Sequence, residues 1–178
     1  MFGRYPRRDN IGALIDAVPP SINNPSPSIY TDTIADLARS AGYKTGLFGK
    51  WHLGTSTYYN GDPSPDFPNG IDIGAFTPAL YGFDVFRGVT MENIPLNGSY
   101  SDWTRNDGGR YSQSTTYAPE VQLTAFIAWW SQNQNPKFAV VAPNIPHSPY
   151  RVPPAQWLPP SYPLPSTQRE KFDAMTVA

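Results

Sequence analysis

The sequence contains no cysteine among its 178 residues. This absence excludes disulfide bonds, thiolate metal sites and a cysteine nucleophile within the chain. No apolar run approaches the roughly 18 residues that a membrane-spanning helix needs, and residues 1–20 lack the apolar core of a signal peptide. The net charge is only −1, which gives no electrostatic footprint for nucleic acid or an anionic membrane. We therefore expect neither a nucleic-acid partner nor a membrane span.

Proline and glycine are abundant instead, with 21 and 14 residues. This share stays below the level that indicates disorder, and the aromatic content of 14% favours a folded chain with long, structured loops. The length fits one domain. Residues 55–117 show no sustained period, so we predict a long, loop-rich and irregular insert there, in which "YGFDVFRG" at 81–88 is the one compact apolar piece.

Two helices show periodic apolar stripes. The first is predicted over 34–41, with Thr33 and Asp36 as a capping box and Gly42 just past its end. The second is predicted to begin near Pro119 and to end before Pro136. The stripes that should face the core are Ile34, Leu37, Ala38 and Ala41 in the first helix, and Leu123, Phe126, Ile127 and Trp130 in the second.

Two apolar runs, "KTGLFG" at 44–49 and "KFAVVAP" at 137–143, predict short strands. The second is continuous enough to be covered on both faces. A last helix is expected to begin near Ser166. The alternation of helices and strands predicts an α/β fold, with a mainly parallel sheet and helices on its faces.

Cationic side chains follow both predicted strands directly. Lys50, Trp51 and His52 come after the first strand, and His147 follows the second within "PHSP". Ligands of open α/β sheets bind outside the carboxyl ends of the strands. Lysine offers three N–H donors, and histidine can donate to an anion or carry a proton near neutral pH. This set suits a tetrahedral oxyanion such as sulfate or phosphate.

Other interpretations stay open at this point. Either histidine alone could be a loop residue that bonds to backbone, and Trp51 could serve packing. A carbohydrate-binding module could use aromatic side chains as its platform; the candidates are Trp51, Tyr58, Tyr59, Tyr81 and Trp103.

The segment "AGYKTGLFGKWHLG" at 41–54 closely resembles the second signature of the sulfatase family, in which G-Y-x-T precedes G-K-W-H-L-G. Further stretches resemble the family in the same order along the chain. They are "GRYPRR" at 3–8, "YGFDVFRG" at 81–88, "APNIPHSP" at 142–149 and "REKFDAM" at 169–175. The resemblance implies hydrolysis of sulfate esters on an alkaline-phosphatase-like fold.

The resemblance also implies roles for individual residues. Lys50 would bind the sulfate group and the hydrated nucleophile. His52 would contact the hydroxyl of the nucleophile and act as base when sulfate is released. His147 would bind the sulfate near the bridging oxygen and help to protonate the leaving alcohol. The implied substrate is a sulfated small molecule or a sulfated glycan, and members of the family are mostly secreted, periplasmic or lysosomal.

The sequence departs from the family pattern at the nucleophile and the metal. The family makes formylglycine from Cys or Ser in C/S-x-P-x-R, which is absent here, and we assign no metal ligand. Calcium and formylglycine are thus expected only in a complete parent domain. We expect residues 1–178 to be a single incomplete N-terminal-type sulfatase domain, with Met1 internal or a misplaced start, that is inactive alone. The alternatives are a related phosphoester or phosphonate hydrolase of the same superfold and a non-catalytic carbohydrate-binding fragment.

Overall fold

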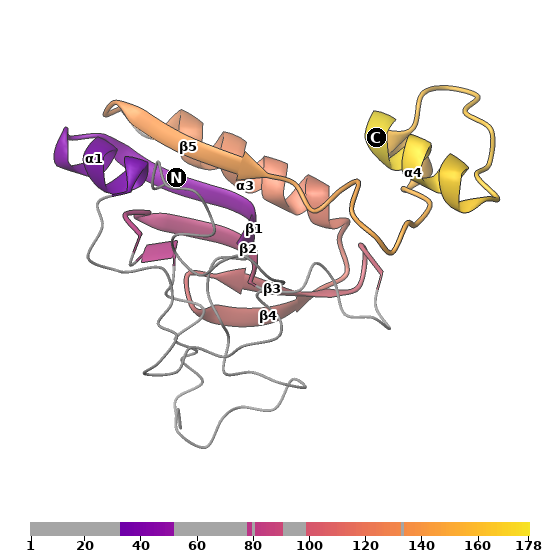
Figure 1. The fold of residues 1–178 in the computed structure, drawn as a ribbon, viewed down its shortest axis with the longest axis horizontal. Helices are drawn as coiled ribbons and strands as arrows, with labels where there is room; N and C mark the ends of the chain where they lie inside the picture. The colour runs from indigo at the N-terminus through magenta and orange to yellow at the C-terminus, as the bar shows by residue number, and fades with distance from the viewer. Residues whose placement is uncertain (1–32, 52–77, 80, 91–98, 133) are drawn as a thin grey trace, which may run out of the picture.

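The computed structural model describes residues 33–51, 78–79, 81–90, 99–132 and 134–178 (Figure 1). These residues contain one five-stranded sheet with the strand order β4-β3-β2-β1-β5. The strands are β1 (Lys44–Trp51), β2 (Val85–Thr90), β3 (Trp103–Asp107), β4 (Arg110–Ser114) and β5 (Lys137–Ala142). The helices are α1 (Ile34–Ser40), α3 (Ala118–Gln132) and α4 (Gln168–Val177).

The sheet is mixed. β1 is parallel to both of its neighbours, β2 and β5, whereas β3 is antiparallel to both β2 and β4. β5, β1 and β2 therefore end at the same edge of the sheet, which Figure 1 shows on the side of α4. This is the edge at which the sequence predicts the site.

Three of the five strands lie in the predicted insert 55–117, so the prediction of irregular structure is wrong for residues 85–90 and 103–114. β4 is mostly exposed and polar, and β3 is polar over most of its length, so neither shows the alternation that marks a half-buried strand. The two strands are joined by Gly108 and Gly109, both with positive φ (61° and 100°), as a two-residue hairpin turn with positive φ at both positions requires. The sequence "NDGGR" carried that signal.

The predicted helix ends are confirmed. The Thr33 side chain accepts a hydrogen bond from the Asp36 N–H at 3.0 Å, and the Asp36 carboxylate accepts one from the Thr33 N–H at 3.1 Å. Gly42 follows α1 with φ +86°. The last helix begins at Gln168, after a second capping box between Thr167 and Glu170.

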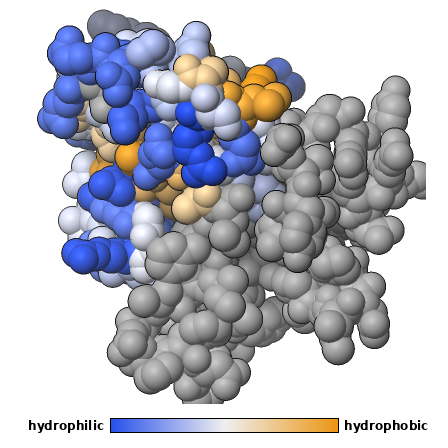
Figure 2. All heavy atoms as spheres, turned by 90° about the vertical axis from the view of Figure 1, so that its left-hand side faces the viewer, coloured by the Kyte–Doolittle hydropathy of each residue, from blue (hydrophilic) through white to orange (hydrophobic). Residues whose placement is uncertain are grey.

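The predicted apolar stripes are wrong for most of their members. Ile34, Leu37, Leu123, Ile127 and Trp130 are exposed. α3 packs on the sheet through Phe126 and Trp129, whose rings lie 5.6 and 5.5 Å from the ring of Phe48. Since apolar residues occur on every side of this helix, periodicity alone could not select the packed face. Figure 2 views the α1 end, where apolar surface appears among hydrophilic residues.

β5 is an edge strand of the described sheet and is not covered on both faces as predicted. Its residues are half-buried, and Val141 is 42% exposed. β1, in contrast, is buried from Thr45 to Gly49. Leu47 lies in one core cluster with Ala35 of α1, whereas Phe48 contacts α3. Because successive strand residues point to opposite faces, α1 and α3 cover opposite faces of the sheet.

The connection from β5 to α4 is rich in proline. Nine of the 23 residues from Pro143 to Pro165 are proline, and one 3-10 turn, Ala155–Trp157, interrupts it. α4 then docks beyond the carboxyl ends of the strands by burying Met175. Met175 joins the second core cluster, whose other buried members are Val89, Tyr100, Trp103, Tyr117 and Ala118.

Candidate active site

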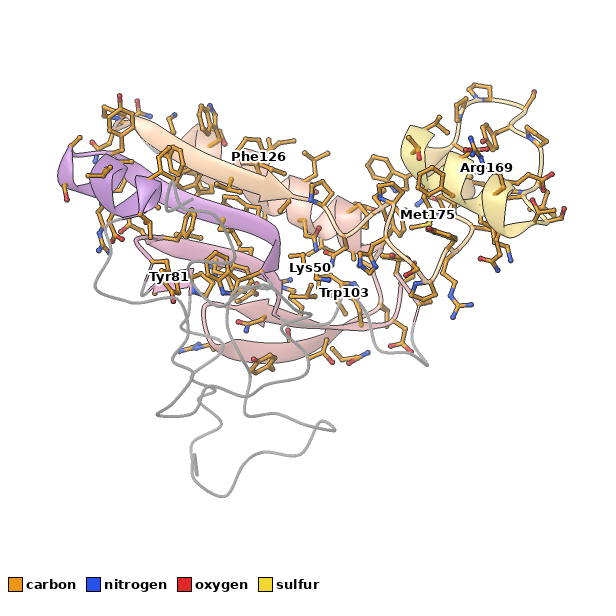
Figure 3. The ribbon with its side chains drawn as sticks, in the orientation of Figure 1. Lys50, Tyr81, Trp103, Phe126, Arg169 and Met175 are labelled. Atoms are coloured by element: carbon orange, nitrogen blue, oxygen red, sulfur yellow. The ribbon has the colours of Figure 1, made fainter. Side chains whose placement is uncertain are left out.

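Lys50 lies at the carboxyl end of β1 and is partly buried (Figure 3). It pairs in register with Val89 of β2, and the alternation along β1 places it on the α3 face of the sheet. The preceding residue, Gly49, has φ +117°, and a Cβ there would lie 1.9 Å from the Ala142 carbonyl oxygen. A Cβ on Gly88 would lie 1.7 Å from the Gly49 oxygen. Glycine at both positions thus lets three strands approach closely beside the lysine.

His147 lies in the loop that follows β5, and its imidazole is exposed. Its Nδ1 is 2.6 Å from the Ser148 carbonyl oxygen. Because a carbonyl only accepts hydrogen bonds, Nδ1 carries the proton in this contact. Nε2 is then the ring nitrogen that can take up or release a proton toward a ligand.

The two residues lie at the ends of neighbouring parallel strands, Lys50 within β1 and His147 in the loop that follows β5. Gly49 pairs with Ala142, so Lys50 and the start of the His147 loop leave the sheet at the same level. Val89, the partner of Lys50, packs in the same cluster as Tyr100, whose hydroxyl donates to the His147 carbonyl at 2.7 Å. His52 lies outside the described residues. We therefore predict, from the shared strand ends, that all three side chains converge on one pocket.

The aromatic platform for a sugar is contradicted by burial. Trp51, Tyr81 and Trp103 are at most 2% exposed. The rings of Trp51 and Tyr81 pack 5.6 Å apart, and the Trp103 indole N–H donates to the Thr116 carbonyl at 2.8 Å. A sugar ring cannot stack on side chains that are already covered by the core. Tyr58 and Tyr59 lie outside the described residues.

Three buried polar residues behind His147 were missed by the sequence analysis. Tyr100, Gln122 and Asn144 are at most 3% exposed. The Gln122 Nε2 donates to Asn144 Oδ1, and the Gln122 Oε1 is buried without a hydrogen-bond partner among the described residues. Of the three, only Asn144 belongs to one of the motifs named above, "APNIPHSP" at 142–149. Within the described part of the chain, the hydroxyl of nearby Tyr117 also lacks a partner, and burial, aided by Tyr100, raises its pKa to about 12.

Among the described residues there is no group of three or more His, Cys, Asp or Glu side chains that could hold a metal ion. The sequence contains no C/S-x-P-x-R segment either. The part of the chain described here thus does not fit a calcium site or a formylglycine nucleophile. In the same part, no helix has the length and apolarity to cross a membrane.

Comparison with known proteins places these features in a family, because the sulfatase family model matches residues 1–174. The chain belongs to the sulfatase family. It is 32% identical to human steryl-sulfatase over 96 residues, which are 53% of this chain and 15% of that protein. It is 42% identical to an arylsulfatase of Hemicentrotus pulcherrimus over 69 residues, or 39% of this chain and 10% of that protein. The matches thus span a minor part of these sulfatases.

Solved structures confirm the fold of this sulfatase sequence. The structure of Ps i-CgsB in complex with k-i-k-neocarrahexaose matches with a TM-score of 0.66 and 20% identity, over 99% of this chain and 39% of that one. A Bacteroides thetaiotaomicron structure from work on glycosaminoglycan metabolism (BT33494S-sulf) matches with a TM-score of 0.63 and 21% identity, over 85% of this chain and 32% of that one. The predicted alkaline-phosphatase-like α/β fold is therefore confirmed. At one edge of its sheet lie β3 and β4, which are antiparallel to each other.

Proposed function

We propose that this chain supplies the oxyanion-binding half of a sulfatase active site, in which Lys50, His52 and His147 bind the sulfate group of a sulfate ester. The observation that carries the proposal is the position of Lys50 and of the His147 loop. They leave the carboxyl ends of two neighbouring parallel strands at the same level, where α/β sheets bind ligands. Family membership supplies the reaction class.

The chemistry follows from the donors. The Lys50 ammonium group offers N–H donors and a positive charge to the sulfate oxygens, and the charge is most effective where it is partly shielded from water. His147, with Nδ1 held by the Ser148 carbonyl, presents Nε2–H to the bridging oxygen as the S–O bond breaks. It thereby protonates the leaving alcohol. His52 takes the part of the base when sulfate is released.

In a complete sulfatase, calcium and formylglycine supply the nucleophile and its charge balance. Neither fits the residues described above, so this chain by itself contributes sulfate binding and proton transfer. We expect the purified 178-residue chain to hydrolyse no sulfate ester above background, because oxyanion donors without a nucleophile retain only a residual rate.

The substrate is a sulfated small molecule or a sulfated glycan. The oligosaccharide in the Ps i-CgsB structure supports a glycan, and the likeness to steryl-sulfatase supports a small molecule. The loops that would choose between them lie within 55–117, much of which is outside the described residues.

Inorganic sulfate is the simplest probe, and Lys44 offers a matched control at the other end of the same strand. Lys50→Gln should weaken sulfate binding by about tenfold, the loss of one hydrogen bond to a charged group, whereas Lys44→Gln should leave it unchanged. Calorimetric titration with sodium sulfate measures the affinity of the wild-type chain and of both variants. Equal losses in both variants would contradict the site.

The reaction class is tested with the protein encoded by the genomic open reading frame that contains this chain. It should hydrolyse 4-nitrophenyl sulfate faster than 4-nitrophenyl phosphate, and Lys50→Gln should abolish the difference. Preferential hydrolysis of the phosphate ester would favour the related phosphoester hydrolase instead.

A further inference from the structure

The loop that carries His147 is held in place by buried polar side chains from outside the sheet. We propose that Tyr100 is a positioning residue for His147, and that Gln122 assists it by fixing Asn144 in the same loop. The inference rests on the proposed function, since it concerns the histidine that would protonate the leaving group.

Tyr100 forms hydrogen bonds through both its side chain and its backbone. Its hydroxyl donates to the carbonyl oxygen of His147 at 2.7 Å and lies 3.4 Å from that of Asn144. Its own carbonyl accepts from the N–H of Ala118, the first residue of α3, at 2.7 Å. The side chain is 3% exposed, and its ring packs edge-on against Tyr117 at 6.4 Å. Tyr100 therefore ties the His147 backbone to the start of α3.

Asn144 holds the other end of the turn 144–147. Its carbonyl accepts from the His147 N–H at 3.3 Å, and its side-chain oxygen accepts from Gln122 of α3. Asn144 and Gln122 are both buried, so water does not compete for these contacts. Two side chains, one preceding α3 and one within it, thus fix both ends of the four-residue turn.

The imidazole depends on this turn for its direction. Its Nδ1 contact goes to the backbone of the next residue, Ser148, so the ring follows the loop backbone. A shift of that backbone moves Nε2 with it, and proton transfer requires hydrogen-bond distance to the leaving oxygen. If Tyr100 had only a structural role, the packing of its ring would be what matters. If it positions His147, the hydrogen bond of its hydroxyl is what matters.

Tyr117 allows these two roles to be separated. It packs in the same cluster as Tyr100 and is buried, but its hydroxyl has no hydrogen-bond partner in the described ranges. Tyr100→Phe and Tyr117→Phe each remove one buried hydroxyl and keep the ring. Only the first removes a contact to the His147 loop.

The test uses the 178-residue chain labelled with ¹⁵N-histidine, which has only two histidines, so that each imidazole gives its own nitrogen signals. We assign them with His147→Gln. Tyr100→Phe should shift the ring nitrogens of His147, change the balance of its Nδ1–H and Nε2–H forms, and leave those of His52 in place. It should also weaken inorganic sulfate binding by about threefold to tenfold. Tyr117→Phe should change neither.

The proposal is overturned if the two variants give the same His147 signals, or if Tyr100→Phe moves both histidines equally. If Tyr100→Phe does not fold, Gln122→Met decides, since it removes the contact to Asn144; unchanged His147 signals in that variant would refute the inference. A wild-type chain that binds no sulfate, but whose His147 signals still respond to Tyr100→Phe, would refute the proposed function and leave the positioning role intact.

Discussion

At the amino end of β1 the buried polar groups satisfy one another, whereas at its carboxyl end several have no partner. The Thr45 hydroxyl donates to the Gly82 carbonyl at 2.6 Å and accepts from the Asp84 N–H at 2.9 Å. The Asp84 carboxylate accepts in turn from the Thr45 N–H at 3.0 Å. Around the carboxyl end, the indole nitrogen of Trp51 and the hydroxyl of Tyr117 are buried and form no hydrogen bond with any residue that the structure describes.

This difference separates two kinds of motif residue. Thr45 comes from the G-Y-x-T part of the family signature, and Gly82 and Asp84 come from the "GFD" segment; together they close the amino end. Lys50 and His147 lie at the opposite end, where some buried polar groups form no hydrogen bond with the described residues. Proteins tolerate such local imperfection at functional sites, so we expect one end of the strand to serve stability and the other to serve the proposed chemistry.

The largest effect is expected for Gly49→Ala. The added Cβ would collide with the Ala142 carbonyl at 1.9 Å, and the backbone has φ +117°. Strand β5 cannot stay in place, and we expect a loss of about 3 kcal/mol or more in the free energy of unfolding. Urea denaturation followed by circular dichroism measures it.

Gly42→Ala is the matched control for that change. It also has a positive φ, +86°, but nothing lies within 4 Å of the added Cβ. Its free energy of unfolding should fall only by the cost of placing alanine in the left-handed conformation, about 1–2 kcal/mol. Equal losses for both glycines would show that strand spacing beside Lys50 is not the limiting factor.

Thr45→Val tests the satisfied end. The variant keeps the shape of a fully buried side chain but leaves the Gly82 carbonyl and the Asp84 N–H without a partner. The free energy of unfolding should fall by about 2–3 kcal/mol, with no change in sulfate affinity. Thr104→Val, on the exposed side of β3, should be within about 0.5 kcal/mol of the wild type. A loss of sulfate binding in Thr45→Val would erase the division between the two ends.

Tyr117→Phe tests the unsatisfied end and should behave in the opposite way. The hydroxyl has no hydrogen-bond partner among the residues that the structure describes, so its removal should relieve a desolvation penalty. We expect the free energy of unfolding to stay the same or rise by up to about 1 kcal/mol in the same denaturation experiment. A clear destabilisation would mean that this hydroxyl does have a partner in solution.

The smallest effect concerns α4, which covers the carboxyl end. Hydrogen bonds from the backbone N–H groups of Thr167 and Ser166, and from the Ser166 hydroxyl, lower the pKa of Glu170 from 4.5 to about 2. Because the pKa is lowered in the folded state, this contact stabilises α4 fully above pH 4.5 and is lost as the pH falls toward 2. Amide exchange in the first turn of α4 should accelerate over that range, and Glu170→Gln should remove the dependence.

Local signals in the sequence were enough to predict the ends of α1 and the positions of β1, α3 and β5. The capping box at Thr33 and the glycine after α1 act over three or four residues, so a single sequence reveals them. The packed face of α3 could not be predicted, because it depends on Phe48, some 80 residues away, and not on the periodicity of the helix. β3 and β4 were missed for a similar reason, since they pair with each other, and β3 with β2, without an apolar alternation.

The strand-end positions of Lys50 and His147 could be predicted because each comes within a few residues of the end of an apolar run. Their supports were not, since the Tyr100 hydroxyl reaches a carbonyl 47 residues along the chain and Gln122 reaches a side chain 22 residues away. Contacts of this kind leave no periodic trace. These contacts can be recognised only in the folded structure, in which Tyr100 and Gln122 reach the loop after β5.

The proline-rich connection after β5 has a consequence for the energetics of ligand binding. Each proline fixes its own φ in the unfolded chain as well as in the folded one, so a segment with nine prolines in 23 residues loses less conformational entropy when it becomes ordered. The His147 loop can therefore hold one shape without belonging to a helix or a strand. An anion that binds there has little ordering left to impose, and more of its contact energy remains as affinity.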